Sequence, residues 1–162
     1  PCLSLLRIDK ARNVAFREDI HTLEDWEYNF RVLTSVRSVF IVDVPYYHYR
    51  SVEGSASKSP LNDRKLTCFK IVDAVRSVVR EKNLPFANDA INVPAFLIYH
   101  MLVAYAKNGD VDKSGERLRA LSRKYLSSIM WSSHVDLKHK IYTLMASINL
   151  ELFGVLYNAK NR

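Results

Sequence analysis

The residues best suited to chemistry lie in two stretches of the first third of the chain. Glu24 and Asp25 form an acidic pair where a helical pattern of apolar residues begins. Further on, an aromatic segment ends in Arg50 and continues into a serine-bearing loop over residues 51–59. A carboxylate can accept a proton from a hydroxyl group that attacks a substrate. A guanidinium group suits diphosphate oxygens, so Arg50 is a candidate ligand for a phosphorylated compound.

Asp25 is the candidate proton acceptor of the acidic pair. At the N-terminus of a helix, backbone N–H groups keep a carboxylate ionised and hold one of its oxygens in a fixed direction. The alternative is that Glu24 and Asp25 are ordinary helix-start residues that oppose the helix dipole, worth up to about 1 kcal/mol each. Trp26 is either a flat apolar wall for a sugar ring or a residue of the core.

The order of these features resembles the acceptor-side half of a family 2 glycosyltransferase of the GT-A fold. In that family an E-D-x-x-F-N segment starts a helix, and residues 24–29 match it with Tyr28 in place of Phe. A P-x-Y-x-Y-R segment and a serine loop usually follow. The residues that fit are Pro45, Tyr47, Tyr49, Arg50, Ser55 and Ser57.

The resemblance covers residues 1–58 and has two departures. Leu23 stands where the family often has a glycine before the acidic pair. Val52 stands near the place where some members carry a histidine, which leaves a metal or diphosphate ligand from this loop open. Upstream, Leu5 and Arg7 match part of a further family segment, and Ser4 replaces its lysine.

The resemblance implies an inverting transferase that moves a sugar from a nucleotide-sugar donor to a saccharide or lipid-linked acceptor in surface polysaccharide synthesis. Asp25 would be the catalytic base, with Glu24 orienting the acceptor. The implied substrate-binding residues are Trp26, Tyr49, Arg50, Ser55 and Ser57. A divalent cation, Mg or Mn, would serve the full-length enzyme. The expected location is the cytoplasm, at the inner face of the plasma membrane.

We expect the chain to be the C-terminal part of such an enzyme. It opens at Pro1 directly into patterned sequence, and the nucleotide-binding half with its D-x-D metal motif is missing. Asp110-Val111-Asp112 has the letters of that motif but follows Asn108-Gly109, so it is interpreted as a turn with a helix cap. Residues 1–58 would belong to the catalytic domain and residues 59–162 to a helical C-terminal region. The fragment alone is expected to bind no cofactor and to be inactive.

Composition limits the choice of partner less than the motifs do. The chain has 162 residues, a formal net charge of +7 and 48% hydrophobic residues, which favours a globular, helix-rich protein with an anionic partner. Nucleic acid is disfavoured because no helix-turn-helix, zinc spacing or RNA-binding signature accompanies the charge. Cys2 and Cys68 have no metal spacing and are interpreted as reduced thiols. His48 lacks a second ligand nearby and is interpreted as structural.

The apolar patterning predicts a mainly α fold, α+β overall. Residues 39–44 form a β-branched and aromatic run that predicts a strand covered on both faces. Four helices are expected after it, over about residues 60–82, 89–107, 112–126 and 133–157. Asn108-Gly109 is expected to cap the C-terminus of the second, and Ser133 with Asp136 is expected to open the last as a capping box. The second is apolar on most sides and should be central, with Pro94 bending it or shifting its start. Trp131 is expected to be buried, the alternative being that it enters an interface.

A non-catalytic function remains open at this stage. The helical region could be an interaction or oligomerisation module. The first 58 residues would then be a peripheral addition to it without a catalytic role. In related transferases such a region commonly forms a homodimer or contacts a membrane surface, so a second copy of the chain and a membrane are the expected partners.

Overall fold

The computed structural model describes residues 6–44, 48, 50, 55 and 58–160. The described chain is mainly helical, as predicted. Its order is α1 (Ile8–Ala11), α2 (Glu24–Leu33), α3 (Asp63–Leu66), η2 (Thr67–Phe69), α4 (Lys70–Glu81), η3 (Asp89–Ile91), α5 (Asn92–Asn108), α6 (Ser114–Trp131), α7 (Leu137–Ile148) and α8 (Leu150–Lys160).

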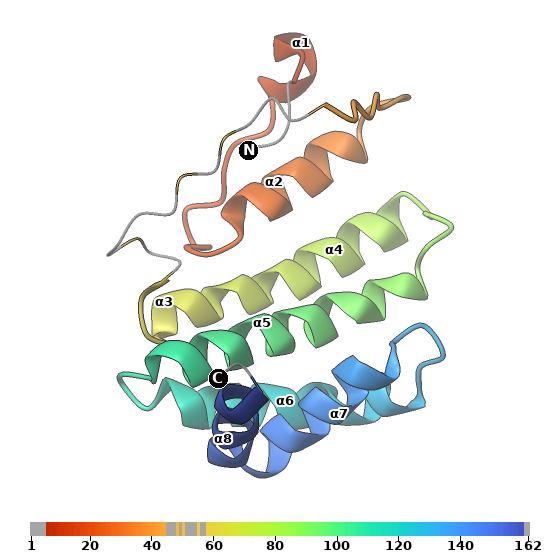
Figure 1. The fold of residues 1–162 in the computed structure, drawn as a ribbon. Coiled ribbons are helices and arrows are strands. Elements are labelled where there is room, and N and C mark those ends of the chain that lie inside the picture. Colours follow the sequence, from red (N-terminus) through yellow and green to blue (C-terminus); the bar gives the residue numbers. More distant parts are fainter. Residues whose placement is uncertain (1–5, 45–47, 49, 51–54, 56–57, 161–162) are drawn as a thin grey trace.

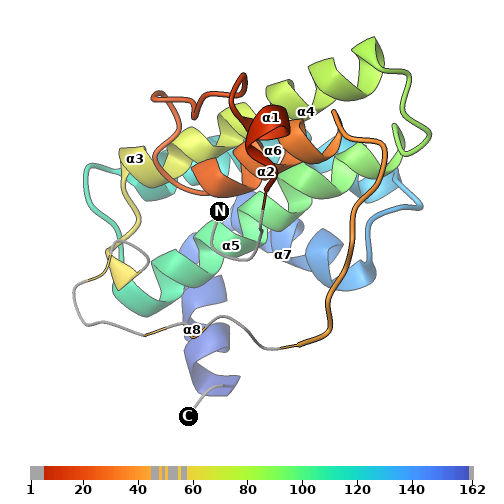
Figure 2. The ribbon, with the colours of Figure 1, turned by 90° about the horizontal axis from the view of Figure 1, so that it is seen from above.

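The helices are stacked in layers with α5 in the middle. Figure 1 shows α2 above α4, α4 beside α5, and the group α6, α7 and α8 below them. The view from above shows α8 running across the end of the bundle, at a large angle to α7 (Figure 2). α5 contacts α4, α6, α7 and α8, which confirms that it is the central helix. Its apolar residues on several sides explain this position, because a helix that is hydrophobic all round must be covered all round.

Both ends of α5 follow from local chemistry. The helix begins at Asn92, which places Pro94 in the first turn, where its missing N–H costs no helical hydrogen bond. The predicted shift of the helix start is therefore observed. At the other end Gly109 has φ 71°, and its N–H donates to the carbonyl oxygen of Tyr105 at 2.8 Å. The predicted glycine cap is confirmed.

Two predicted helices have different bounds. The first begins at Asp63 and not with Pro60 in its first turn, because the Asn62 side chain accepts the N–H of Lys65 and caps it. The last predicted helix is two helices. Its N-cap is Asp136, whose carboxylate accepts the N–H of His139 at 2.8 Å, so the capping box expected from Ser133 is wrong. Asn149 has an extended backbone that separates α7 from α8.

The predicted strand over residues 39–44 is wrong for the described structure. These residues follow α2 as an irregular segment, and the described part of the chain contains no strand beyond an isolated bridge between Leu61 and Asp110. Phe40 and Ile41 are 93% and 92% exposed. A strand forms by pairing with a neighbour, and no described strand lies beside this run to pair with it.

The expected burial of Trp131 is also wrong. α6 extends to Trp131, five residues beyond its predicted end, and the Trp131 side chain is 89% exposed. Ile129 is fully buried, so the helix leaves the core in its final turn. Among the described residues, no helix has the length and apolar character needed to cross a lipid bilayer.

Candidate functional site

The acidic pair begins α2, as the sequence predicts, and the residue before it has an unusual backbone. Glu24 is the first residue of α2, and Leu23 precedes it with φ 61° and ψ 24°, in the left-handed region. The Leu23 carbonyl oxygen accepts the N–H of Glu27 at 3.1 Å, which closes the first helical turn. A side chain with a Cβ is strained in this conformation, and glycine is not. The chain therefore enters α2 through a turn that favours glycine.

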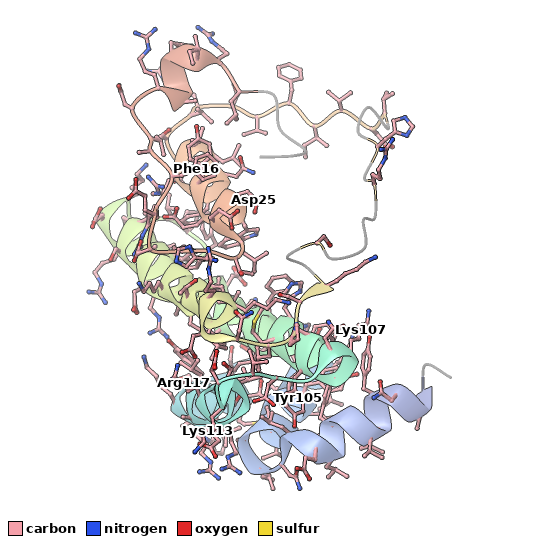
Figure 3. The ribbon with its side chains drawn as sticks, turned by 90° about the vertical axis from the view of Figure 1, so that its left-hand side faces the viewer. Phe16, Asp25, Tyr105, Lys107, Lys113 and Arg117 are labelled. Atoms are coloured by element: carbon pink, nitrogen blue, oxygen red, sulfur yellow. The ribbon has the colours of Figure 1, made fainter. Side chains whose placement is uncertain are left out.

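Asp25 lies in the first turn of α2 and is half-buried. Its Oδ1 accepts the N–H of Trp26 at 2.8 Å, which restrains one oxygen of the carboxylate. Glu24 beside it is also half-buried. Figure 3 shows Asp25 on α2, well away from Tyr105 and Lys107 at the end of α5. One oxygen of the Asp25 carboxylate is therefore restrained at the start of α2.

Trp26 is outside the core. Its side chain is 40% exposed, and its ring stacks on Phe30 with centroids 5.8 Å apart and an interplanar angle of 6°. The buried apolar residues of α2 are Tyr28 and Val32, and Phe30 is partly buried against the core of the bundle. The stacked pair leaves a flat aromatic surface next to Asp25 in sequence.

An ion pair within α2 has one buried partner, and its arginine also contacts the segment before the helix. The Glu27 carboxylate is 1% exposed and receives two hydrogen bonds from Arg31, at 2.7 and 2.9 Å. Arg31 also donates to the carbonyl oxygen of Ala15 at 2.7 Å. Phe16 then stacks on Tyr28 with centroids 4.3 Å apart. These contacts tie the segment before the acidic pair to the helix that carries it.

The remaining predicted site residues are not assembled around Asp25 by any described contact. Arg50 is exposed and Ser55 is half-buried. Tyr49 and Ser57, like Pro45 and Tyr47 of the matched segment, lie outside the described residues. Within the described part of the chain, no group of three or more His, Cys, Asp or Glu side chains is placed to hold a metal ion. Cys68 is buried and free, and burial raises the pKa of its thiol to about 12.

Two surface pockets lie at the other end of the molecule and were not predicted. One, of about 510 Å³, lies between α5 and α8 and is lined by Tyr105, Ala106, Gly109 and Gly154 among others. The second, of about 360 Å³, lies on the other side of the Tyr105 ring, next to Gly115. Neither is lined by Asp25. A Cβ on Gly115 would meet Tyr105 Cε2 at 3.3 Å, so the missing side chain allows close packing there.

The pKa of Tyr105, which borders both pockets, is raised from its ordinary value. Burial is the largest cause, and the negative charges of Asp110 and Glu151 act in the same direction. Asp110 Oδ2 accepts the N–H of Gly115 at 2.9 Å, in the first turn of α6. The Asp110–Asp112 triplet therefore lies in the turn before α6, as predicted, while the N-cap residue is Lys113. The sequence places Gly115 at the start of one helix and Gly154 within another, and only the packing of α5 against both helices brings the two glycines to the ring of Tyr105.

No protein-family model, curated protein or solved structure matches this chain. The chemistry of the candidate site therefore follows from its own residues.

Proposed function

We propose that this chain forms the acceptor side of an inverting glycosyltransferase of the GT-A type, with Asp25 as the base. The observation that carries the proposal is the left-handed backbone of Leu23. The resemblance places a glycine at that position, directly before the acidic pair, and the conformation is one that favours glycine. Agreement between a sequence pattern and an independent backbone angle supports the alignment of residues 23–29 with the family motif. Strained residues of this kind are concentrated at functional sites.

Asp25 would act on the hydroxyl group of the acceptor. The N–H of Trp26 holds Oδ1, so the second carboxylate oxygen is left to accept the proton as the hydroxyl attacks the anomeric carbon. The aromatic surface of Trp26 and Phe30 would support the sugar ring by stacking. Glu24 would orient the acceptor. Tyr49, Arg50, Ser55 and Ser57 keep the substrate-binding roles that the resemblance implies, as does a Mg or Mn ion for the donor diphosphate.

The exposed segment after α2 supports a larger catalytic domain around residues 1–58. Val39, Phe40, Ile41 and Val42 are all exposed, although β-branched and aromatic residues on successive positions suit a strand that is covered on both faces. A sheet contributed by a donor-binding half would pair with this segment and bury it. The proposed division into residues 1–58 and a helical region from residue 59 rests on the contrast between this exposed segment and the buried core of the helices.

The test is Asp25→Asn in a chain that includes the donor-binding half. We expect a loss of transfer of about 10²–10⁴-fold, the contribution typical of a general base, with folding and donor binding retained. Glu18→Gln is the matched control, because Glu18 is an exposed carboxylate in the segment before α2. Near-normal transfer by the Asp25→Asn variant would remove Asp25 from the mechanism. Residues 1–162 alone are expected to show no turnover.

Acceptor binding can be tested in the present chain. Trp131→Phe leaves Trp26 as the remaining tryptophan. We expect oligosaccharide acceptors to change the Trp26 emission, and Trp26→Leu to weaken acceptor binding in a fluorescence-independent assay such as calorimetry. Saturating oligosaccharide that leaves the emission and the heat unchanged would count against an acceptor site at α2.

A non-catalytic interaction module is the second candidate. It is favoured by the uncovered apolar side chains of α7 and α8, which are unrelated to the acidic pair. If the double variant Glu24→Gln, Asp25→Asn transfers sugar normally in the longer chain, this second function becomes the better assignment.

A further inference from the structure

The larger of the two pockets, called here the α5–α8 pocket, has no role in the proposed transfer reaction. It lies where one side of α8 faces the last turn of α5, and its volume of about 510 Å³ suits a small molecule. Figure 3 shows Tyr105 at this place, between the end of α5 and α8. Asn158 Nδ2 donates to the carbonyl oxygen of Ala106 at 3.2 Å, so a hydrogen bond joins the two helices beside the pocket. The lining residues from α8 are spaced so that they share one side of the helix, and they are Glu151, Gly154, Val155, Asn158 and Ala159.

Gly154, in the middle of α8, is not required by the backbone or by packing. Its φ lies outside the left-handed region, unlike that of Gly109. The nearest atom that a Cβ on Gly154 would meet is Tyr105 Cε1 at 4.0 Å, an ordinary contact, whereas a Cβ on Gly115 would lie 3.0 Å from Asp110 Oδ2. Glycine inside a helix is less stable than alanine, because its backbone loses more freedom on folding. A side chain at position 154 would enter the pocket, so the open space is the feature that accounts for the glycine.

The charge at this pocket is negative, although the chain as a whole is basic. Among its described lining residues Glu151 is charged, and no Lys, Arg or His is present. In the described part of the chain the Glu151 carboxylate has no ion-pair partner. The carbonyl end of α5 lies at the pocket, and this end of a helix carries partial negative charge. The pKa of Tyr105 is raised first by burial and then by the negative charges of Asp110 and Glu151, so the negative field reaches the tyrosine.

We propose that the α5–α8 pocket binds a small organic cation that carries an ammonium group. The Glu151 carboxylate would pair with the ammonium group, and the ring of Tyr105 would attract the cation and contact the organic part. An anion is disfavoured by Glu151 and by the carbonyl end of α5. A purely apolar ligand would cover the carboxylate without giving it a partner. The ammonium group can belong to an aromatic amine or to an amino sugar. This inference does not depend on the proposed transfer reaction.

The experiment titrates residues 1–162 with amines and with neutral counterparts of similar shape, and follows the backbone amide signals by NMR. The probes are phenethylamine against 2-phenylethanol, and glucosamine against glucose, at a pH where both amines are protonated. We expect one amine to bind at least about ten-fold more tightly than its counterpart, with shifts at the amides of Gly109 and Gly154. The amine that binds more tightly tells which of the two sources the pocket fits. No binding, equal binding of each amine and its counterpart, or shifts confined to other residues would overturn the proposal.

A charge substitution tests the partner of the ammonium group. Glu151→Gln should weaken binding of the amine at least about five-fold and leave binding of its neutral counterpart unchanged. Glu116→Gln is the matched control, because Glu116 lines the neighbouring pocket and not this one, so its variant should bind as the unmodified chain does. An equal loss in the two variants would place the cation in the neighbouring pocket and overturn the assignment. Unchanged binding by Glu151→Gln would overturn it as well.

Filling the pocket tests its location. Gly154→Leu should abolish binding, and the smaller change Gly154→Ala should weaken it at least about three-fold. Gly154→Ala should also raise the midpoint of urea unfolding, because alanine favours the helix and its Cβ meets Tyr105 at an ordinary distance. This variant therefore carries the test if Gly154→Leu does not fold. Ala120→Leu adds a side chain of the same size at an exposed position of α6 and should leave binding unchanged. Normal amine binding by a folded Gly154→Ala chain would overturn the assignment.

Discussion

The N-terminal third and the helical bundle bury their apolar residues to very different extents. In the bundle, the core runs from Leu61 to Phe153 through every long helix. In the described part of residues 1–58, the buried apolar side chains are Ile20, Tyr28 and Val32, while residues 39–44 are exposed. The balance of charged residues also differs between the two parts. Residues 1–58 have eight basic and eight acidic side chains, and residues 59–162 have sixteen and nine.

The difference teaches that the helical bundle supplies most of the apolar core, to which the N-terminal third adds Ile20 with Leu23 and Phe30 packed against it. α2 packs on α4, and the two parts are joined by polar contacts such as His21 N–H to Thr67 Oγ1 at 2.9 Å and Lys82 Nζ to the Thr34 carbonyl oxygen at 3.0 Å. Such contacts orient α2 but contribute little net free energy. We therefore expect the part of the chain that carries the site candidates to open more easily than the bundle, as is common for binding and catalytic segments.

The largest effect should come from the centre of the bundle. Leu102 in α5 is fully buried, so Leu102→Ala should lower the free energy of unfolding by about 2–5 kcal/mol through lost burial and a cavity. Ile41→Ala is the matched control in the exposed segment and should change it by less than about 0.5 kcal/mol. Urea unfolding followed by circular dichroism measures both. A large loss for Ile41→Ala would mean that this segment is already covered in solution.

The second-largest effect compares the local stability of the two regions directly. Arg31→Met leaves the buried carboxylate of Glu27 without its partner, which should favour opening of α2 by about 2 kcal/mol, below the usual range for a fully buried pair because Arg31 is partly exposed. Hydrogen exchange should quicken in α2 and in the segment around Ala15 while α5 and α6 keep their protection. Arg37→Met, at an exposed arginine after α2, is the control. Equal acceleration throughout the chain would mean that the two regions unfold as one unit.

Local chemistry made part of the fold predictable. The start of α2 at Glu24, the central place of α5 and the cap at Gly109 follow from acidic first turns, apolar content and glycine conformation, which depend on neighbours in sequence. The N-cap of α7 was misplaced for a related reason. Ser133 and Asp136 both have capping side chains, and in the structure Asp136 caps α7, next to the buried Val135.

The rest depended on distant partners. A β-branched run predicts a strand only if another strand lies beside it, and residues 39–44 have none among the described residues. α2 packs on α4 with Phe30 partly buried against the core, whereas Trp26 is exposed. Of the candidate site, the position of Asp25 at a helix start was predictable, whereas the pockets around Tyr105 required the packing of three helices.

A smaller effect tests whether the entry to α2 is strained. Leu23→Gly should raise the free energy of unfolding by up to about 1 kcal/mol, because glycine adopts φ 61° without the Cβ penalty, although the lost leucine contacts offset part of this gain. Leu33→Gly is the matched control at the last residue of α2, where glycine should destabilise by about 0.5–1 kcal/mol. Opposite signs for the two variants in urea unfolding support a glycine-type turn at Leu23. The same sign for both would remove the backbone argument for the family alignment.

The smallest effect concerns pH and belongs to the bundle. The pKa of Asp136 is lowered from its ordinary value of 3.8, because the carboxylate accepts the backbone N–H of His139 and then its ring Nδ1–H. A lowered pKa in the folded state means that the unfolded chain binds the proton more readily. The stabilisation is therefore complete above about pH 4 and is lost as the pH falls through the lowered pKa. Asp136→Asn keeps a cap but cannot ionise, so its melting temperature should lie slightly below that of the unmodified chain at pH 7, and the two should converge in acid. A gap that stays constant from pH 7 to pH 2 would show that the carboxylate charge contributes nothing at the start of α7. The start of α7 would then be positioned by packing alone.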